Sequence, residues 1–171
     1  ILHDLAGQVR KDIFIVCGTN GKTTTTALVG EIMKNYFSDV KVVGNIGIPY
    51  TSVAADTTEE TVTVAEISSF QLETAVEFRP EVSAILNITP DHLNRHHTME
   101  NYIAAKESIT KNQTADDICV LNYEDEVLRE FGAGLQTKVI YFSSARKLEN
   151  GYYLDGTDIC RAVDGKAEHI C

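Results

Sequence analysis

The chain has 171 residues, with 15 basic and 25 acidic side chains, and a formal net charge of −10. This length fits one domain, and a composition that is 43% hydrophobic and 23% charged is typical of a globular protein rather than a disordered or fibrous one. No apolar run approaches the roughly 20 residues that span a bilayer, so we expect no membrane insertion. The acidic balance argues against binding to nucleic acid, which needs clustered Lys and Arg.

The first residue and the cysteines bear on the origin of the chain. It begins at Ile1 rather than Met and has no signal-peptide pattern, so we expect an internal piece of a longer protein. Its cysteines are Cys17, Cys119, Cys160 and Cys171. Their spacing matches neither a disulfide framework nor a metal knuckle, which favours reduced thiols in a cytoplasmic protein.

Apolar, β-branched runs alternate with helical patterns along most of the chain. The predicted strands are residues 12–17, 40–44, 61–67, 82–88, 117–122 and 138–143. The predicted helices are residues 22–37, 99–113 and 124–131. In the first helix Leu28, Val29, Ile32, Met33 and Tyr36 share one face, which we expect to be buried. The alternation predicts an α/β fold: a mostly parallel P-loop-type sheet with helices on both faces.

The C-terminal residues 151–170 have a different pattern. Two Asp-Gly pairs, at 155–156 and 164–165, separate short β-rich segments. Asp-Gly between such segments is a strong hairpin signal. We therefore expect a hairpin or three-stranded meander here, forming a small antiparallel appendage to a single domain that covers residues 1–171.

A phosphate-loop pattern lies between the first strand and the first helix. Its residues are Gly18, Thr19, Asn20, Gly21, Lys22, Thr23 and Thr24. In such a loop the backbone N–H groups surround an anion, Lys22 reaches the β/γ-phosphates and the Thr23 hydroxyl binds Mg²⁺. The strict pattern has Gly where this chain has Val16, so Gly18 makes the turn in a variant loop. The alternative is a Gly-rich strand–helix turn without catalytic meaning.

Two further side chains follow predicted strands. Glu66 lies at the end of the third strand, and His92 follows the fourth. The carboxyl ends of parallel strands open into one crevice, so we expect both residues to line the same edge as the loop. Glu66 then supplies an oxygen ligand for Mg²⁺. The alternative for His92 is a structural histidine, and we assign only surface or packing roles to His3, His96, His97 and His169.

Lys106 falls on the apolar side of the helix predicted at 99–113. On a helical wheel it lies in the middle of the stripe formed by Met99, Tyr102, Ile103 and Ile109. An inward lysine serves a site, or it pairs with a buried carboxylate or extends to water. The pattern by itself favours neither interpretation.

Five stretches resemble the Mur ligase superfamily, the ATP-dependent amide-forming enzymes of peptidoglycan synthesis. They are Gly18-Thr-Asn-Gly-Lys-Thr-Thr24, Gly44-Asn-Ile-Gly47, Glu66-Ile-Ser-Ser-Phe-Gln-Leu72, Asp91-His-Leu-Asn-Arg-His96 and Tyr102-Ile-Ala-Ala-Lys106. They follow the family's order within residues 17–106. The third stretch is more similar to members that add D-glutamate than to those that add alanine, a diamino acid or a dipeptide, or to the folylpolyglutamate synthetases.

The resemblance implies roles for individual residues. Lys22 and Thr23 hold the phosphates of ATP and a first Mg²⁺, Glu66 completes the shell of that ion, and His92 binds a second Mg²⁺. Lys106 matches a lysine carried as a carbamate, which makes Lys22, His92 and Lys106 the catalytic candidates. The implied contacts to the muramoyl substrate are Asn45, Ser68 and Gln71. Two positions depart from the family: Cys17 replaces a common Thr, and Asn94 replaces a frequent Asp and is not assigned as a ligand.

The resemblance also implies a reaction and a setting. The substrates are UDP-N-acetylmuramoyl-L-alanine and D-glutamate, joined through an acyl phosphate in a monomeric enzyme of the bacterial cytoplasm. This chain corresponds to part of the central ATP-binding domain, without the uridine-nucleotide and amino-acid domains, and we expect it to be inactive alone. The alternatives are another ligase of the superfamily, such as a folylpolyglutamate synthetase, and a non-catalytic P-loop nucleotide-binding module.

Overall fold

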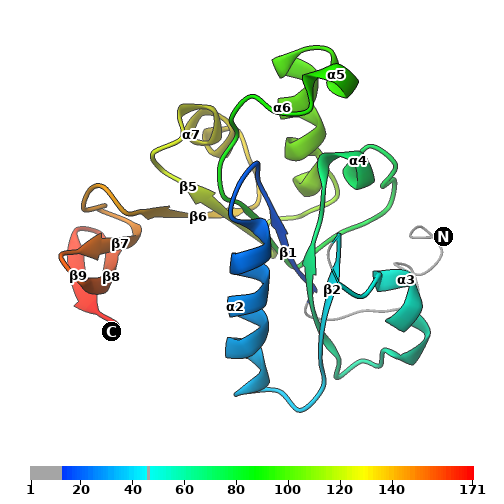
Figure 1. Ribbon diagram of the computed structural model, residues 1–171. Helices are drawn as coiled ribbons and strands as arrows, with labels where there is room; N and C mark the ends of the chain where they lie inside the picture. Colours follow the sequence, from blue (N-terminus) through cyan, green and yellow to red (C-terminus); the bar gives the residue numbers. More distant parts are fainter. Residues whose placement is uncertain (1–12, 46) are drawn as a thin grey trace.

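The computed structural model describes residues 13–45 and 47–171 (Figure 1). The strands are β1 (Ile13–Cys17), β2 (Val40–Gly44), β3 (Val62–Glu66), β4 (Val82–Ile85), β5 (Ile118–Asn122), β6 (Lys138–Ser143), β7 (Gly151–Asp155), β8 (Asp158–Val163) and β9 (Lys166–His169). The helices are α2 (Lys22–Lys34), α3 (Tyr50–Val53), α4 (Ser69–Leu72), α5 (Leu93–His96), α6 (Met99–Glu107) and α7 (Glu126–Ala133), with 3₁₀ turns at Ala54–Asp56 and Ser108–Thr110.

The strands form one sheet in the order β2-β3-β1-β4-β5-β6-β7-β8-β9. Every pair from β2 to β7 is parallel, whereas β7–β8 and β8–β9 are antiparallel. This arrangement confirms the predicted fold class, including the antiparallel appendage. The meander joins the main sheet because β7 pairs in parallel with β6, so it extends the sheet instead of forming a separate layer.

The main hydrophobic core lies on one face of the sheet. Alternate residues of the central strands point into it, including Ile15, Ile85 and Leu121, and Tyr102 of α6 and Leu128 of α7 pack against them. In Figure 1, α2 crosses the sheet on the side opposite to α6 and α7. A smaller cluster supports the meander, made up of Leu148, Tyr153, Cys160 and Ala162.

Helix α2 differs from its prediction in length and in the face that it buries. It ends at Lys34, and the residues that it buries are Thr26 and Gly30. Leu28, Ile32 and Tyr36, predicted to be buried, are 60%, 46% and 80% exposed. The small side chains explain the difference: a methyl group on Gly30 would overlap Val42 of β2, so the helix packs closely along its small residues. Val29 and Met33 of the predicted face are half-buried.

Other element bounds shift for local reasons. The helix predicted at 99–113 becomes α6 followed by a 3₁₀ turn at Ser108–Thr110. The last predicted helix begins two residues later than expected, because the side chain of Asp125 accepts a hydrogen bond from Leu128 N and caps α7 there. The strand predicted at 82–88 ends at Ile85. None of the helices described is long and apolar enough to cross a membrane.

The meander has the turn chemistry that its sequence predicts. Asp164 and Gly165 both have positive φ angles, of 51° and 74°, as a two-residue hairpin turn between β8 and β9 requires. Gly156, between β7 and β8, has a φ of 65°. The four cysteines are free thiols, as expected, and only Cys171 is exposed.

Candidate active site

The phosphate loop lies between β1 and α2 at the carboxyl edge of the sheet. Gly18 and Gly21 have φ angles of 146° and 82°, which side-chain-bearing residues rarely adopt. A Cβ on Gly18 would also come within 3.1 Å of the Cβ of Leu86. No side chain caps the N-terminus of α2. The first N–H groups of that helix are therefore available to an anion, and the helix dipole favours negative charge there.

Asn87, which follows β4, holds the loop in shape. Its Oδ1 accepts hydrogen bonds from Thr19 N at 3.1 Å and Asn20 N at 2.8 Å. Its Nδ2 donates to the carbonyl of Asn20 at 3.0 Å, and its own carbonyl accepts from Thr19 N at 2.9 Å. We did not predict this role. The available signal was an amide side chain at the end of a strand next to the loop.

Lys22 begins α2 and bends back over the loop. Its Nζ donates a hydrogen bond to the carbonyl of Thr19 at 2.9 Å. The charged group therefore lies on the loop itself, next to the N–H groups that would surround an anion. The contact satisfies one of its three donors, which leaves the ammonium able to bind oxygens of a phosphate.

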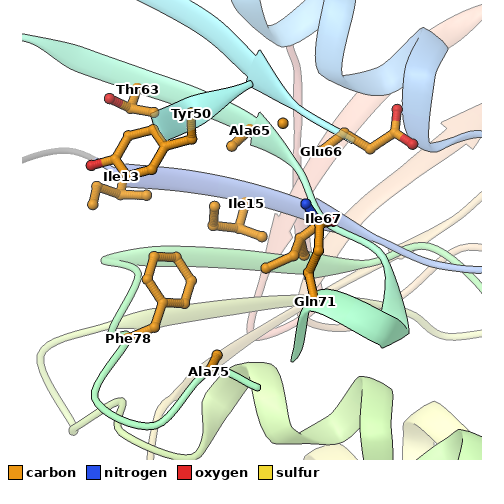
Figure 2. A pocket seen from close by; sticks show the side chains of 11 residues that line it. Ile13, Ile15, Tyr50, Thr63, Ala65, Glu66, Ile67, Gln71, Ala75 and Phe78 are labelled. Carbon is orange, nitrogen blue, oxygen red and sulfur yellow. The ribbon is translucent and has the colours of Figure 1, made fainter. Parts of the chain in front are cut away.

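Glu66 lies at the end of β3 and joins two of the predicted site residues. It is 3% exposed. Thr23 Oγ1 donates to its Oε2 at 2.9 Å, and Asn45 Nδ2 donates to its Oε1 at 3.2 Å. Figure 2 shows the carboxylate turned towards α2. A carboxylate and a hydroxyl are hard oxygen ligands, so this pair fits Mg²⁺, an ion that keeps several waters and phosphate oxygens in its shell.

His92 lies on a different part of the rim. It has a φ of 52°, unusual for a residue with a side chain and found preferentially at functional sites. Its Nε2 lies 3.4 Å from Asp91 Oδ2, and its ring centroid lies 5.0 Å from that of Phe70. Within the described ranges no hydrogen bond joins His92 to Glu66, and no cluster of three His, Cys, Asp or Glu side chains forms a metal site.

Lys106 points into the protein, so the burial that the helical wheel suggests is confirmed. It is 2% exposed, and its Nζ donates to the carbonyl of Gly18 at 2.8 Å. The Nζ lies 3.9 Å from Cys17 Sγ and 4.6 Å from the centroid of the Tyr102 ring. Burial lowers the pKa of Lys106, and the nearby Cys17 and Asp91 only partly oppose this shift. A lowered pKa favours the neutral amine, which is the form that can react with CO₂.

Ser68 and Gln71 form the start of α4. Gln71 Oε1 accepts from both the backbone N and the Oγ of Ser68 at 2.9 Å, and Ser68 Oγ accepts from Gln71 N at 3.4 Å. This reciprocal arrangement is a capping box. Both side chains therefore have a structural function already, and contacts to a substrate would be additional to it.

An apolar pocket lies under α4, on the core side of β3 (Figure 2). Its lining includes Ile13, Ile15, Ile67 and Phe78, and it reaches Gln71. Among the residues that the structure describes, the buried hydroxyl of Tyr50 in this region has no hydrogen-bond partner, and burial raises the pKa of this group. Glu66 also lines this pocket, and Figure 2 shows its carboxylate turned away from the apolar side chains, so the pocket borders the phosphate site at Glu66.

Fold and site together define a class of protein. It has a parallel α/β sheet in which a P-loop variant after the first strand meets a buried carboxylate on a neighbouring strand, an arrangement typical of ATP-handling domains. Residues 16–168 match the family described as Mur ligase middle domain, and the chain belongs to this family. The resemblance seen in the five sequence stretches is therefore confirmed at the level of the family.

Individual relatives point in the same direction. The chain is 58% identical over 159 residues to a protein of Lachnoclostridium phytofermentans named UDP-N-acetylmuramoylalanine–D-glutamate ligase, and 55% identical to the protein of that name from Clostridioides difficile. These matches cover 93% and 92% of the chain. The chain spans only about a third, 35%, of the length of each relative.

Solved structures support the fold. The structure of a UDP-N-acetylmuramoyl-L-alanyl-D-glutamate–2,6-diaminopimelate ligase matches 95% of this chain and 39% of its own, with a TM-score of 0.69 and 20% identity. The MurF ligase from Thermotoga maritima, solved in complex with ADP, matches 98% of this chain and 42% of its own, with a TM-score of 0.67 and 19% identity.

Proposed function

We propose that the chain is the ATP-handling part of a ligase that joins D-glutamate to UDP-N-acetylmuramoyl-L-alanine. The observation that carries this proposal is the pairing of Thr23 with Glu66 at 2.9 Å beside the phosphate loop. A P-loop hydroxyl beside a buried carboxylate supplies oxygen ligands of the kind that a nucleotide-bound Mg²⁺ needs, and this supports the proposal. The name shared by the two relatives supports D-glutamate as the amino acid.

The proposed reaction has two steps. A carboxylate oxygen of the alanyl group attacks the γ-phosphorus of ATP, which forms an acyl phosphate and releases ADP. The amine of D-glutamate then attacks the acyl carbon, the amide bond forms, inorganic phosphate leaves and the amine gives up a proton. The chain contributes charge neutralisation and alignment, because Lys22 and the N-terminus of α2 face the phosphates in the first step.

The remaining site residues receive roles within this proposal. Thr23 and Glu66 hold a first Mg²⁺, which would neutralise charge on the β- and γ-phosphates. His92 binds a second Mg²⁺ on the other side of the crevice. Lys106, buried below Gly18, is carried as a carbamate. Asn45, Ser68 and Gln71 line the path of the muramoyl substrate, and Asn45 is fixed there by its hydrogen bond to Glu66.

The setting of the enzyme is also part of the proposal. The longer protein has a domain for the uridine nucleotide before this chain and a domain for the amino acid after it. The enzyme acts as a monomer in the bacterial cytoplasm. A chain of 171 residues that spans 35% of its relatives should therefore bind Mg²⁺-ATP without forming the amide bond.

The test is a domain exchange. The chain replaces the matching 159-residue part of the Lachnoclostridium relative, which supplies the other two thirds, and phosphate release is measured with UDP-N-acetylmuramoyl-L-alanine and D-glutamate. We expect D-glutamate-dependent release that Lys22→Ala abolishes and that Lys34→Ala, a change at an exposed lysine, leaves intact.

A second exchange controls for specificity. The corresponding part of a diaminopimelate-adding ligase, placed in the same host, should give no release. A folded exchange protein that binds Mg²⁺-ATP but releases no phosphate would contradict the proposed ligase and favour a nucleotide-binding module.

A further inference from the structure

His96 is a buried histidine between two polar partners from another element. It ends α5 and is 3% exposed. Its Nε2 lies 2.9 Å from Ser69 Oγ of α4, and its Nδ1 lies 3.2 Å from Oε1 of Glu73, the residue that follows α4. A carboxylate can only accept, so in the neutral ring Nδ1 carries the proton and Nε2 accepts from the hydroxyl of Ser69. Both ring nitrogens thus join α5 to α4.

The order Ser–His–Glu resembles a nucleophilic triad, but burial excludes that function. Ser69 is 2% exposed, so a substrate carbonyl cannot reach its hydroxyl. The ring of His96 is covered by Phe70 at 5.3 Å and Tyr102 at 5.1 Å between centroids. Ser69 and His96 are closed off from solvent, whereas the Glu73 side chain is 35% exposed and also binds Arg95. With its hydroxyl buried, this group is a structural connection.

Helix α5 needs such a connection because its own backbone fixes it poorly. It has four residues, and both flanking residues have positive φ angles, 52° at His92 and 68° at His97. A single helical turn contributes little stability of its own. Its position therefore depends on side-chain contacts with neighbouring elements.

Those contacts converge on α4. The ring centroids of Phe70 and His92 lie 5.0 Å apart, and Arg95 Cζ lies 4.4 Å from the centroid of the Phe70 ring. Arg95 Nη2 donates to the second oxygen of Glu73 at 3.0 Å. Helix α6 fixes the other side, where Asn101 Nδ2 donates to the carbonyl of His96 at 2.9 Å. Of the polar links between α4 and α5, that of His96 is the buried one, whereas Arg95 is half exposed.

We propose that His96 is a positioning residue that fixes α4, with Ser68 and Gln71, relative to α5, which begins directly after His92. This inference rests on the proposed function, in which Ser68 and Gln71 bind the muramoyl substrate and His92 binds the second metal ion. His96 would set the distance between these two groups. Asn87 anchors the phosphate loop, which reaches the surroundings of His96 through the 3.1 Å hydrogen bond between Thr19 Oγ1 and Tyr102 Oη. Loss of the connection therefore affects the muramoyl substrate more than ATP binding.

Variants of His96 separate the polar contacts from the packing. His96→Phe keeps a flat ring against Phe70 and Tyr102 but removes both polar links. His96→Gln places an amide near the former Nε2 and retains the link to Ser69. Ser69→Ala removes the same link from the other side. A structural role in stability alone would lower Tm in all three variants without moving substrate affinity.

The first measurement uses the 171-residue chain and nuclear magnetic resonance. We expect His96→Phe and Ser69→Ala to shift the ring signals of His92 and the side-chain amide signals of Gln71, and His96→Gln to restore them in part. The backbone amide of Asn20, which donates to Asn87 Oδ1, should keep its position. Unchanged His92 and Gln71 signals in a folded His96→Phe or Ser69→Ala variant would overturn the proposal.

The second measurement uses the exchange protein. With His96→Phe the KM for UDP-N-acetylmuramoyl-L-alanine should rise about tenfold, the scale expected for a residue that orients a ligand-binding group, while the KM for ATP changes less than about twofold. His96→Gln should recover most of the change. Equal KM values in all variants would overturn the inference. An inactive unsubstituted exchange protein would instead count against the proposed function, and the resonance measurement would still decide the role of His96.

Discussion

The two halves of the candidate site are held in place in different ways. The phosphate loop takes its shape from two glycines with positive φ angles and is anchored by one residue, Asn87, whose side chain binds the backbone of Thr19 and Asn20. The α5 segment is held by side chains that reach it from α4 and α6. The loop therefore combines a local backbone conformation with a tertiary anchor, whereas the position of α5 depends on tertiary side-chain contacts alone.

The largest effect is expected at the loop itself. Lys22→Ala in the 171-residue chain should weaken Mg²⁺-ATP binding by about tenfold to a hundredfold, because a hydrogen bond to a charged group contributes about 1.5–3 kcal/mol. Calorimetry measures the change, with Lys34→Ala, whose side chain is 50% exposed, as the matched control. Equal affinities in the two variants would show that the loop does not bind phosphate.

A change at Asn87 tests whether this residue, which follows β4, holds the phosphate loop in shape. Asn87→Ala removes three side-chain hydrogen bonds, and we expect a loss of about 1–3 kcal/mol in stability together with weaker Mg²⁺-ATP binding. Asn122→Ala is the control, because Asn122 ends the next strand and binds Leu86 and Glu124 rather than the loop. Comparable losses of nucleotide affinity in both variants would contradict the role of Asn87.

The smallest effect concerns Lys106, which supports the loop from below through Gly18. Burial lowers its pKa below the ordinary value of 10.5. The unfolded chain therefore binds more protons between the folded pKa and pH 10.5, so the lysine's contribution to stability rises with pH in that window and falls as pH decreases.

Thermal unfolding of the wild type and of Lys106→Met from pH 8 to pH 10.5 tests this. The wild type should gain stability relative to the variant as pH rises, measured as a rising difference in Tm between the two. Lys34→Met, a change at an exposed lysine, is the matched control. If the wild type instead gained stability relative to Lys106→Met as the pH is lowered, the folded protein would stabilise Lys106 as a cation.

These contrasts also explain which parts of the site were predictable. The loop was recognisable from Gly18 and Lys22 because its conformation follows from local glycines and a strand–helix junction. The inward position of Lys106 followed from helical periodicity, which Tyr102 and Ile109 share. Glu66 was placed correctly beside Thr23 because the carboxyl ends of parallel strands meet at one edge.

Contacts between residues far apart in the sequence were not predictable in the same way. The pairing of His96 with Ser69 and Glu73 joins residues more than twenty positions apart, and no local pattern indicates it. The role of Asn87 likewise depends on which strand lies next to β1. The prediction for α2 was wrong because apolar spacing marks a possible buried face, whereas the shape of β2 at Val42 selected the face with Gly30.

Gly30 also has a consequence for protein engineering. The missing methyl group sets the distance between α2 and β2, and a methyl group added there would push the helix away from Val42. Lys22 begins the same helix, about 12 Å from Gly30 at a rise of 1.5 Å per residue. Because a helix moves nearly as a rigid body, its start would move with its middle. The position of Lys22 in the phosphate loop can therefore be adjusted from Gly30, a buried residue further along the helix.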